Sequence, residues 1–415
     1  MGARALEPPY RLAWRVDTEG PVSGVAVIGD LGIAIGEDAV YAIDLVHGRI
    51  AWTVARSGGR PLRPVALRFA GRSLLLFTES ASRAATTDSA STPTDVVALD
   101  LGDRSERWRV RFEAGVPGAV AVGDGLAYVV DGDGVLSALD LANGDERWSA
   151  DAAGATDAPP TLVGPVLLVA GRVAGSVGRL AALDAATGAP VWGDAVASEI
   201  PAASAIAARA GEAVVVGGDR LVRAVDAVDG AERWRSLVVN LPSPVIAPLV
   251  VPGAVYVADY AGGVYRFDPE TGDRMWDQQL NRLLVRSSLV AAGDAVVVGT
   301  NDGHLVALDA ATGHVVADRS TGPGLLGPIT VAGDILLVPK SGADPGLLAL
   351  ATDPDGTLLD VASPTVLDVA GSLGRYVVAL FAVVVGIVVL PGGLARRFLP
   401  GVRGPRRRGG DGGAT

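Results

Sequence analysis

A spaced pattern of three residues recurs along the chain and restricts its fold more than any other feature. An Asp is followed four positions later by a Gly and, after four more, by a Trp. The copies are Asp44/Gly48/Trp52, Asp140/Gly144/Trp148, Asp184/Gly188/Trp192, Asp226/Gly230/Trp234 and Asp268/Gly272/Trp276. An alternating apolar run ends at each Asp, so each copy is typical of a strand, a tight turn and a second strand. Gly permits the positive φ of such a turn, and the Asp carboxylate accepts its backbone N–H groups.

The spacing between copies predicts a repeat architecture. Trp192, Trp234 and Trp276 follow one another at 42-residue intervals, and further Trp residues lie at 14, 52, 108 and 148. Within a unit, three short apolar runs precede the Trp run, as in 245–250, 254–258, 263–268 and 274–278. Short strands repeated every forty-odd residues are typical of four-stranded propeller blades. We therefore predict an all-β, eight-bladed β-propeller of four-stranded antiparallel blades over residues 10–363.

The count of strands indicates how the ring closes. Sets of the first three strands number eight, whereas Trp-type strands number nine if the positions held by Ala317 and Asp360 are included. The run around Trp14 has no first half of a repeat before it. We expect this N-terminal strand to complete the last blade, which leaves the strand around Asp360 as a lead-out.

Three departures mark where the repeat is weak. The second blade carries an insertion from Ser80 to Asp95, rich in Ser, Thr and Ala, which predicts a surface loop. Its turn has Arg104 where Gly is expected. In the last two blades Ala317 and Asp360 stand at the Trp position, and Thr352 replaces the Asp.

The composition changes after Pro364. Residues 376–395 contain no charge, and a helix of that length just spans a bilayer core of about 30 Å. We predict a linker at 364–375, a transmembrane helix at 376–395 and a basic, disordered tail at 396–415. The six arginines of the tail favour a cytoplasmic C-terminus and an extracytoplasmic propeller at the cell membrane. The first ten residues carry no signal-peptide pattern, so this topology needs an export signal upstream of Met1; the alternative is a tail-anchored protein with a cytoplasmic propeller.

Charge and residue usage exclude several functions. The formal net charge is −11 although arginines gather in the tail, so nucleic acid is not an expected partner. The absence of cysteine removes disulfides, thiolate metal sites and a Cys nucleophile. The histidines are His47, His304 and His314; two lie in the outer turns or just after them, and one starts a strand. They show no metal-ligand spacing and are interpreted as exposed turn residues.

The repeated residues themselves are interpreted as structural. We expect the Asp and Gly of each copy to form the turn, and the Trp to pack on the neighbouring blade while its N–H finds a backbone acceptor. The predicted blade-docking tryptophans are Trp14, Trp52, Trp108, Trp148, Trp192, Trp234 and Trp276.

One form of the repeat resembles a known family. The run Ala-Leu-Asp-Ala-Ala-Thr-Gly followed by Trp, at 182–192 and nearly again at 307–313, is similar to the tryptophan-docking repeat of the pyrroloquinoline quinone (PQQ)-type propellers. The resemblance covers about residues 10–361. This family includes quinoprotein alcohol and glucose dehydrogenases as well as the assembly lipoprotein BamB, so the resemblance implies the fold without deciding the function.

The resemblance implies two classes of function. The alcohol dehydrogenases place adjacent cysteines over the quinone and a Glu, an Asn and an Asp around calcium, and no such set can be mapped on this chain. The acids and amide in comparable turns are interpreted as turn formers: Asp131, Asp133, Asp259, Asn301 and Asp302. No catalytic, cofactor or metal residues are therefore predicted, although PQQ and calcium stay possible.

We interpret the chain as a membrane-anchored, non-catalytic scaffold or sensor with a protein partner at the envelope. The alternatives are a PQQ-dependent dehydrogenase-like enzyme and an envelope carbohydrate or ligand binder, for which the tryptophans would need an exposed face. Ligand contact is expected on the face built from blade-to-blade connections and from loops between second and third strands. The candidate contact residues there are Arg63, Tyr260, Arg286 and Lys340.

Overall fold

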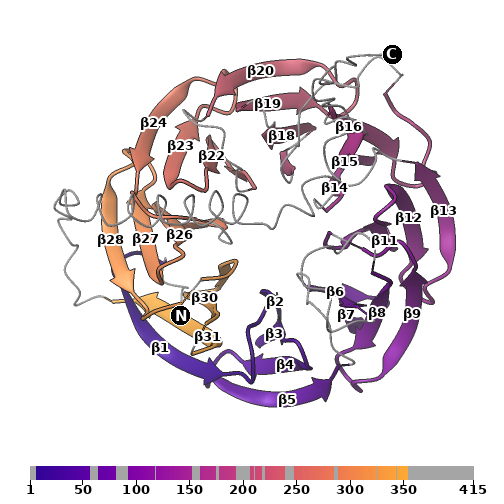
Figure 1. The fold of residues 1–415 in the computed structure, drawn as a ribbon, viewed down its shortest axis with the longest axis horizontal. Helices are drawn as coiled ribbons and strands as arrows, with labels where there is room; N and C mark the ends of the chain where they lie inside the picture. The colour runs from indigo at the N-terminus through magenta and orange to yellow at the C-terminus, as the bar shows by residue number, and fades with distance from the viewer. Residues whose placement is uncertain are drawn as a thin grey trace, which may run out of the picture. The chain divides into compact units, whose positions relative to one another are not determined.

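The computed structural model of the chain describes the following residues: 6–56, 64–80, 92–116, 118–151, 159–173, 177–192, 206–209, 211–216, 220–238, 247–284, 288–324, 326–342 and 344–353. In them the regular secondary structure consists of β-strands, which form eight antiparallel sheets. Seven sheets have four strands and one has three. This arrangement is the predicted eight-bladed propeller, and Figure 1 shows the blades following one another in chain order.

Each blade begins with two strands joined by a tight turn. The first strands are β2 (Val25–Ile28), β6 (Val65–Phe69), β10 (Ala121–Gly123), β14 (Thr161–Val163), β17 (Ala207–Arg209), β21 (Leu249–Val251), β25 (Leu289–Ala292) and β29 (Thr330–Ala332). The second strands are β3 (Leu31–Ile35), β7 (Arg72–Ser80), β11 (Leu126–Val130), β15 (Val166–Val173), β18 (Glu212–Val216), β22 (Ala254–Ala258), β26 (Ala295–Gly299) and β30 (Ile335–Lys340).

The third and outer strands complete the blades. The third strands are β4 (Ala39–Asp44), β8 (Thr94–Asp100), β12 (Val135–Asp140), β16 (Val177–Asp184), β19 (Leu221–Asp226), β23 (Gly263–Phe267), β27 (His304–Asp309) and β31 (Gly346–Thr352). The outer strands, which lie on the rim in Figure 1, are β5 (Arg49–Ala55), β9 (Glu106–Phe112), β13 (Glu146–Asp151), β20 (Glu232–Leu237), β24 (Arg274–Gln279), β28 (Val315–Ser320) and β1 (Tyr10–Asp17).

The fourth blade has three named strands, and the short segment at its outer position is bonded to β16. Pro190 forms a bridge with Leu183, and the N–H of Val191 donates to the carbonyl of Ala182 at 2.9 Å. Trp192, which ends this described segment, is buried. The outer position of the fourth blade is therefore occupied by the start of a strand-like segment.

Burial explains why second and third strands carry unbroken apolar runs. All five residues of β26 are buried, as are all five of β22. Both faces of these strands are covered because a blade lies on either side, so neither face needs polar residues. Outer strands such as β9 alternate instead, with Trp108 buried between exposed neighbours, because one of their faces meets solvent.

The apolar core is divided among the joints between blades. Among the described residues it forms eight clusters, each drawing buried side chains from two neighbouring blades. The cluster with Ile33 and Leu75 joins the first blade to the second, and the cluster with Ala34 and Leu337 joins the eighth to the first. Every blade is therefore stabilised from both sides, and the core has no single centre.

The N-terminal strand closes the ring. β1 pairs with β31 in antiparallel register, with Tyr10 opposite Thr352 and Leu12 opposite Leu350. It becomes the outer strand of the eighth blade, whose other strands come from the end of the described chain. Closure of this kind joins segments more than three hundred residues apart, so that unfolding of the last blade also releases the first residues.

A different set of contacts holds the seventh and eighth blades together, where Ala317 stands in place of Trp. Leu6 and Tyr10 enter the cluster that contains Ala317. Arg319 Nη1 donates to the carbonyl of Tyr10 at 2.8 Å, and the N–H of Asp353 donates to the carbonyl of Pro9 at 2.7 Å. The N-terminal segment therefore supplies at this joint the contacts that a Trp makes elsewhere.

The C-terminal predictions lie outside the described residues. These are the linker at 364–375, the helix at 376–395, the tail at 396–415 and the lead-out strand around Asp360. Across the part of the chain that the structure describes, no helix is long and apolar enough to cross a bilayer. Membrane anchoring therefore stays a prediction from the sequence.

The turn glycine of the repeat is expected to be intolerant of any side chain. Gly272 has φ +74°, and a Cβ there would lie 2.5 Å from Cε3 of Trp234. We expect Gly272→Ala to lower the free energy of unfolding for two reasons. A left-handed backbone conformation costs an alanine about 1–2 kcal/mol, and overpacking against Trp234 costs about 1–3 kcal/mol more. Chemical denaturation monitored by tryptophan fluorescence measures the change.

A matched control exists in the same blade. Gly253 has φ +79°, and no atom lies within 4 Å of a Cβ built on it. Gly253→Ala should therefore cost the strain alone. Equal losses of stability in the two variants would show that contact with Trp234 is not what requires glycine at position 272.

Candidate functional site

The polar residues that the fold buries gather on one face of the propeller. This face, here called the loop face, is formed by the ends of the second strands, the starts of the third strands and the connections between blades. Seven of the ten buried polar residues among those described lie there: Arg56, Thr78, Glu79, Thr94, Asp259, Thr300 and Lys340. Burial of polar groups is costly unless each is bonded, so these positions define how the loop face is built.

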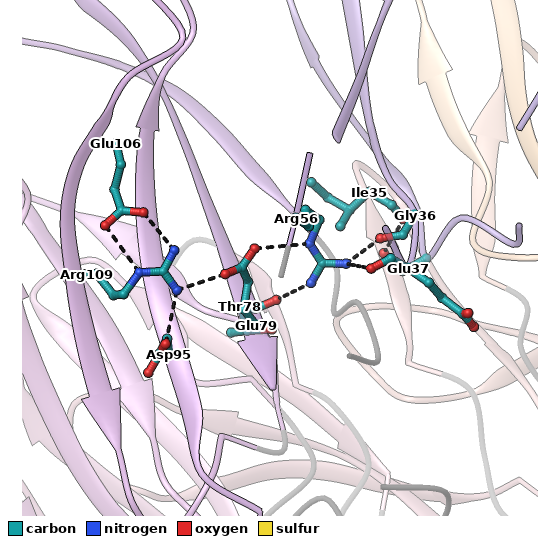
Figure 2. Close-up of polar contacts among 10 residues, drawn as sticks. Ile35, Gly36, Glu37, Arg56, Thr78, Glu79, Asp95, Glu106 and Arg109 are labelled. Carbon is teal, nitrogen blue, oxygen red and sulfur yellow. Dashed lines mark hydrogen bonds and ion pairs between the residues drawn. The ribbon is translucent and has the colours of Figure 1, made fainter. Parts of the chain in front are cut away.

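A charge network joins the first two blades at the loop face (Figure 2). Arg56, which directly follows β5, has a side chain with 0% exposure. Its Nη1 donates to the carbonyls of Gly36 and Glu37, the latter at 3.2 Å, and its Nη2 donates to the carbonyl of Thr78 at 2.9 Å. The guanidinium therefore ties the connection after the first blade to the second strands of both blades.

Glu79 supplies the neighbouring negative charge. Its Oε1 lies 3.6 Å from Arg56 Nε, and its Oε2 accepts from Arg109 Nη1 at 2.8 Å. Arg109 also contacts Asp95 and Glu106, so two arginines and three carboxylates form one connected group, as Figure 2 shows. Burial lowers the pKa of Arg56, and the charge of Glu79 opposes this effect. Sequence reasoning missed this network, although a Glu that ends an apolar strand is a signal for one.

Of the four predicted contact residues, the structure describes Tyr260 and Lys340, which belong to different blades. Arg63 and Arg286 lie outside the described residues. Tyr260 is partly buried against the core between the sixth and seventh blades, and its carbonyl accepts from the N–H of Leu284. Lys340 belongs to the eighth blade and is 2% exposed, with Nζ donating to the carbonyl of Thr321 at 2.8 Å. The ammonium of Lys340 is therefore occupied inside the protein.

Two of the acids considered as calcium ligands, Asp131 and Asp259, are bonded to donors that follow closely in the chain. Asp131 accepts the N–H groups of Asp133 and Val135. Asp259 accepts the N–H of Gly263 and the hydroxyl of Tyr265, each at 3.0 Å. Because these acids accept bonds that hold their loops and stand on different blades, they do not fit a shared cation site, and in the described ranges no three His, Asp or Glu side chains are grouped as metal ligands.

The seventh blade holds a second polar group on the loop face. Arg282 contacts Asp302 and lies 3.1 Å from Asp318, which lies 2.5 Å from Nδ1 of His304. Asp302 also accepts from the hydroxyl of Thr300. The side chain of His304 is partly buried, which differs from the expectation of an exposed turn residue, because β27 places it against β28.

The insertion of the second blade is shorter than the sequence indicates. β7 continues to Ser80 and β8 begins at Thr94, so both ends of the predicted loop are paired strand. Asp95 therefore lies in a strand and contacts Arg109. Residues 81–91 lie outside the description.

The repeated Asp and Gly residues form the turns at the opposite face. The N–H of Gly48 donates to the carbonyl of Asp44, and the same bond forms at Gly144, Gly188, Gly230 and Gly272 with Asp140, Asp184, Asp226 and Asp268. The carboxylates accept further N–H groups of the turn. Arg147 holds the pKa of Asp140 below its usual range, and Arg233 does the same for Asp226. Hydrogen bonds from His47 and Thr187 lower the pKa values of Asp44 and Asp184 in the same way.

The tryptophans of the outer strands contact the turn of the next blade. Six of them donate Nε1–H to the carbonyl of the residue after the Asp position, over 2.8–3.2 Å: Trp14 to Leu45, Trp108 to Leu141, Trp148 to Ala185, Trp192 to Ala227, Trp234 to Pro269 and Trp276 to Ala310. Trp52 meets Arg104, whose guanidinium lies 5.6 Å from the ring centroid. Arg104 has φ +63°, so it keeps the backbone conformation of the Gly that it replaces.

Acid is expected to weaken the second blade through Asp100. Its carboxylate is buried and accepts from Arg72 and Arg107, and the Arg72 bond leads the effects that lower its pKa. A carboxylate whose pKa is lowered in the folded state stabilises the protein at pH values above the pKa of an unfolded Asp, about 3.9. This stability is lost as the pH falls through the pKa of the folded state. We expect Asp100→Asn to be less stable at pH 7 and to lose less stability below about pH 4. Denaturation midpoints measured across this pH range test it; parallel curves for the two proteins would contradict it.

The fold and its joints define the class of protein: an eight-bladed propeller whose blades contact one another through outer-strand tryptophans and Asp–Gly turns. A family model described as outer membrane protein assembly factor BamB matches residues 81–200 and 176–327, which together extend over more than half of the chain. The chain belongs to this BamB-like family of PQQ-type propellers.

Individual relatives include both an assembly factor and an enzyme. The outer membrane protein assembly factor BamB of Bordetella pertussis is 27% identical over 335 residues, which are 76% of this chain and 80% of that protein. The quinohemoprotein alcohol dehydrogenase of Comamonas testosteroni is 33% identical over 124 residues, 26% of this chain and 18% of that protein. The crystal structure of BamB from Moraxella catarrhalis has a TM-score of 0.62 at 19% identity, covering 83% of this chain and all of that one, which shows the shared fold.

Proposed function

We propose that the chain is a membrane-anchored, non-catalytic β-propeller that acts as a protein-interaction scaffold or sensor at the cell envelope. The observation that carries this proposal is that the repeated polar residues form hydrogen bonds and ion pairs within the propeller. The turn Asp residues accept bonds from their own turns, and acids of the loop face such as Glu79, Asp95 and Asp318 are paired with basic side chains of the propeller. A chain whose polar residues hold its blades is suited to presenting loops to a partner. The match to an assembly factor over 80% of that protein's length supports the same conclusion.

The docking residues are proposed to act mechanically. Six of the seven tryptophans bond a carbonyl of the next blade's turn, and five of them cover its Gly, so the set fixes the angle between neighbouring blades. The scaffold then holds loops from different blades at constant separations. Such rigidity lowers the entropy that a partner loses on binding several loops together.

The anchor in this proposal is the uncharged run at 376–395. Six arginines follow it, which favours a cytoplasmic tail and places the propeller on the extracytoplasmic side. A reporter enzyme fused after Thr415 should be active in the cytoplasm. Reporter activity found exclusively outside the cytoplasm would show the opposite orientation. Release of the fusion protein from membranes by alkaline carbonate would show that the run at 376–395 is not a membrane anchor.

The partner is proposed to contact the loop face through Arg63, Tyr260 and Arg286. Lys340 acts there by holding the connection after the seventh blade, because its ammonium is bonded to Thr321. Cross-linking in intact cells, followed by purification of the tagged full chain, should recover a partner that Arg63→Glu combined with Arg286→Glu loses. Arg235→Glu, an exposed reversal on the rim strand β20, is the matched control. Equal recovery with both variants would exclude these loop-face contacts.

A quinone-dependent enzyme is the outcome that would overturn the non-catalytic proposal. Titration of the purified chain with PQQ and calcium should change neither the absorbance of the quinone nor the melting temperature of the protein. Dye-linked dehydrogenase activity restored by PQQ and calcium would establish the enzyme instead, whether or not a partner is recovered.

A further inference from the structure

The rim of the propeller is charged on some blades and apolar on others. In the second, third and fifth blades the two residues before the Trp are Glu and Arg: Glu106-Arg107, Glu146-Arg147 and Glu232-Arg233. Each of these arginines pairs with the turn Asp of its own blade. In the eighth and first blades the same positions hold Leu12-Ala13 and Ile50-Ala51. The charged pattern that protects an outer strand from contact is therefore missing on these two adjacent blades, as it is at Pro190-Val191 of the fourth blade and Val315-Val316 of the seventh.

These two blades expose apolar and basic side chains together. Leu12 is 45% exposed, Ile50 is 40% exposed, and Val46 in the turn between β4 and β5 is 70% exposed. Arg11, His47 and Arg49 are exposed beside them, the Arg49 side chain by 72%. We name this surface the apolar-basic rim: Arg11 to Ala13, Val46, His47 and Arg49 to Ala51.

Charge distinguishes the apolar-basic rim from the rest of the protein. The carboxylate in the turn of this surface is Asp44, which accepts the N–H groups of Val46 and His47 and lies 2.7 Å from His47 Nδ1. Arg49 is 3.7 Å from the same carboxylate, whereas the structure gives Arg11 no carboxylate within ion-pair distance among the described residues. Arg11 and Arg49 are thus exposed on an edge that also holds Asp44 and, beside Pro9, Asp353. The net charge of the whole chain is −11 even with six arginines in its tail.

The two halves of the rim are held together. Trp14, two residues after Leu12, donates to the carbonyl of Leu45 and packs on Gly48, on either side of Val46 and His47. Figure 1 shows β1 and β5 following one another along the rim. Leu12 and Ile50 are therefore parts of one continuous edge that spans the joint between the blades.

The described part of the chain ends at this same edge. Thr352, at the end of β31, is opposite Tyr10, and the N–H of Asp353 bonds the carbonyl of Pro9. The described chain therefore ends beside Arg11 and Leu12. The uncharged run begins at residue 376, so residues 354–375 are the whole connection between this edge and the proposed anchor.

We propose that the apolar-basic rim rests on a lipid surface with anionic headgroups. Arg11 and Arg49 face the phosphates, and Leu12, Val46 and Ile50 enter the boundary between headgroups and acyl chains. The acidic remainder of the body is repelled by the same surface, which favours this edge over the others. The propeller then stands on its rim, so the loop face stays open to a partner. This inference rests on the membrane anchor of the proposed function.

Cysteine labelling of the full chain tests the inference, because the chain has no cysteine of its own. Leu12→Cys and Ile50→Cys carry an environment-sensitive fluorophore, and Glu146→Cys and Glu232→Cys, at the equivalent strand positions of the third and fifth blades, are the matched controls. The protein is reconstituted in phosphatidylcholine vesicles with or without phosphatidylglycerol. We expect the two rim labels to shift to shorter wavelength and to become several-fold less accessible to an aqueous quencher in the anionic vesicles. The control labels should not change.

Charge reversal supplies the second measurement. Arg11→Glu combined with Arg49→Glu should return the rim labels to the values of the controls, and added salt should act in the same direction. A thermal melt of this variant establishes that the propeller is folded. Rim labels that stay as accessible to the quencher as the control labels in anionic vesicles would overturn the inference. Rim labels that are equally shielded in detergent, in a protein that also forms cross-linked dimers, would overturn it too, because a second copy of the chain would then cover the rim. Extraction from the vesicles by alkaline carbonate separates these results from failure of the anchor itself.

Discussion

Replacement of Trp108 by alanine should lower the free energy of unfolding by about 3–5 kcal/mol, the usual cost of removing a buried Trp. The indole lies in the cluster between the second and third blades. Its Nε1–H donates to the carbonyl of Leu141 at 3.0 Å, and its ring covers Gly144 of the next blade. Chemical denaturation of the full chain, followed by far-ultraviolet circular dichroism, measures the loss.

Two controls separate packing from hydrogen bonding. Trp108→Phe keeps most of the aromatic surface, so it should cost less stability than Trp108→Ala. It loses the N–H, and the unpaired carbonyl of Leu141 should lower the free energy of unfolding by about 1–3 kcal/mol. Leu237→Ala, an exposed side chain on the outer strand β20, should change stability by less than about 0.5 kcal/mol. A Trp108→Ala variant as stable as Leu237→Ala would contradict the mechanical role of the repeated tryptophans.

Neutralising Glu79 is expected to be nearly as damaging. Glu79→Gln removes the carboxylate in contact with Arg56 while keeping the shape of the side chain. Breaking a buried ion pair costs about 3–5 kcal/mol. We expect a loss near the lower end, about 3 kcal/mol, because Arg56 keeps its carbonyl acceptors on Gly36, Glu37 and Thr78. The midpoint and slope of urea denaturation measure the change.

The same blade offers a control for this substitution. Glu113 pairs with Arg111 at 2.8 Å, and both side chains are exposed. Glu113→Gln should therefore cost at most about 1 kcal/mol. The double substitution Arg56→Leu with Glu79→Leu should lower the free energy of unfolding by less than the sum of the two single substitutions. The reason is that the double variant leaves neither charge buried without its partner. Equal effects of Glu79→Gln and Glu113→Gln would mean that burial does not strengthen the Glu79 contact.

The fold could be predicted from the sequence because its information is local and repeated. Each turn needs its Asp and Gly at fixed spacing, and each blade needs three apolar runs before the Trp. The 42-residue interval then gives the blade count without knowledge of any contact. The unpaired run around Trp14 indicated where closure would be found, and β1 does pair with β31.

The candidate site was harder to predict because it depends on pairs that are distant in sequence. Arg56, Glu79 and Arg109 lie on different strands of two blades, and no spacing rule relates them. The sequence predicts Lys340 as a ligand contact, and the structure adds that its ammonium donates to the carbonyl of Thr321 in the connection after β28. The sequence predicts an exposed side chain for His304, whereas the pairing of β27 with β28 sets it beside Asp318.

The Asp–Gly–Trp repeat by itself determined the class of fold, the number of blades and the residues at the joints, because turn geometry and strand alternation act over a few neighbouring residues. The tertiary structure decided which charges are buried together, as in the Arg56–Glu79 network. It also decided which edge carries apolar and basic residues side by side. Those features arise when the ring closes and brings the two ends of the chain to one edge, and such long-range proximity has no local signal in the sequence.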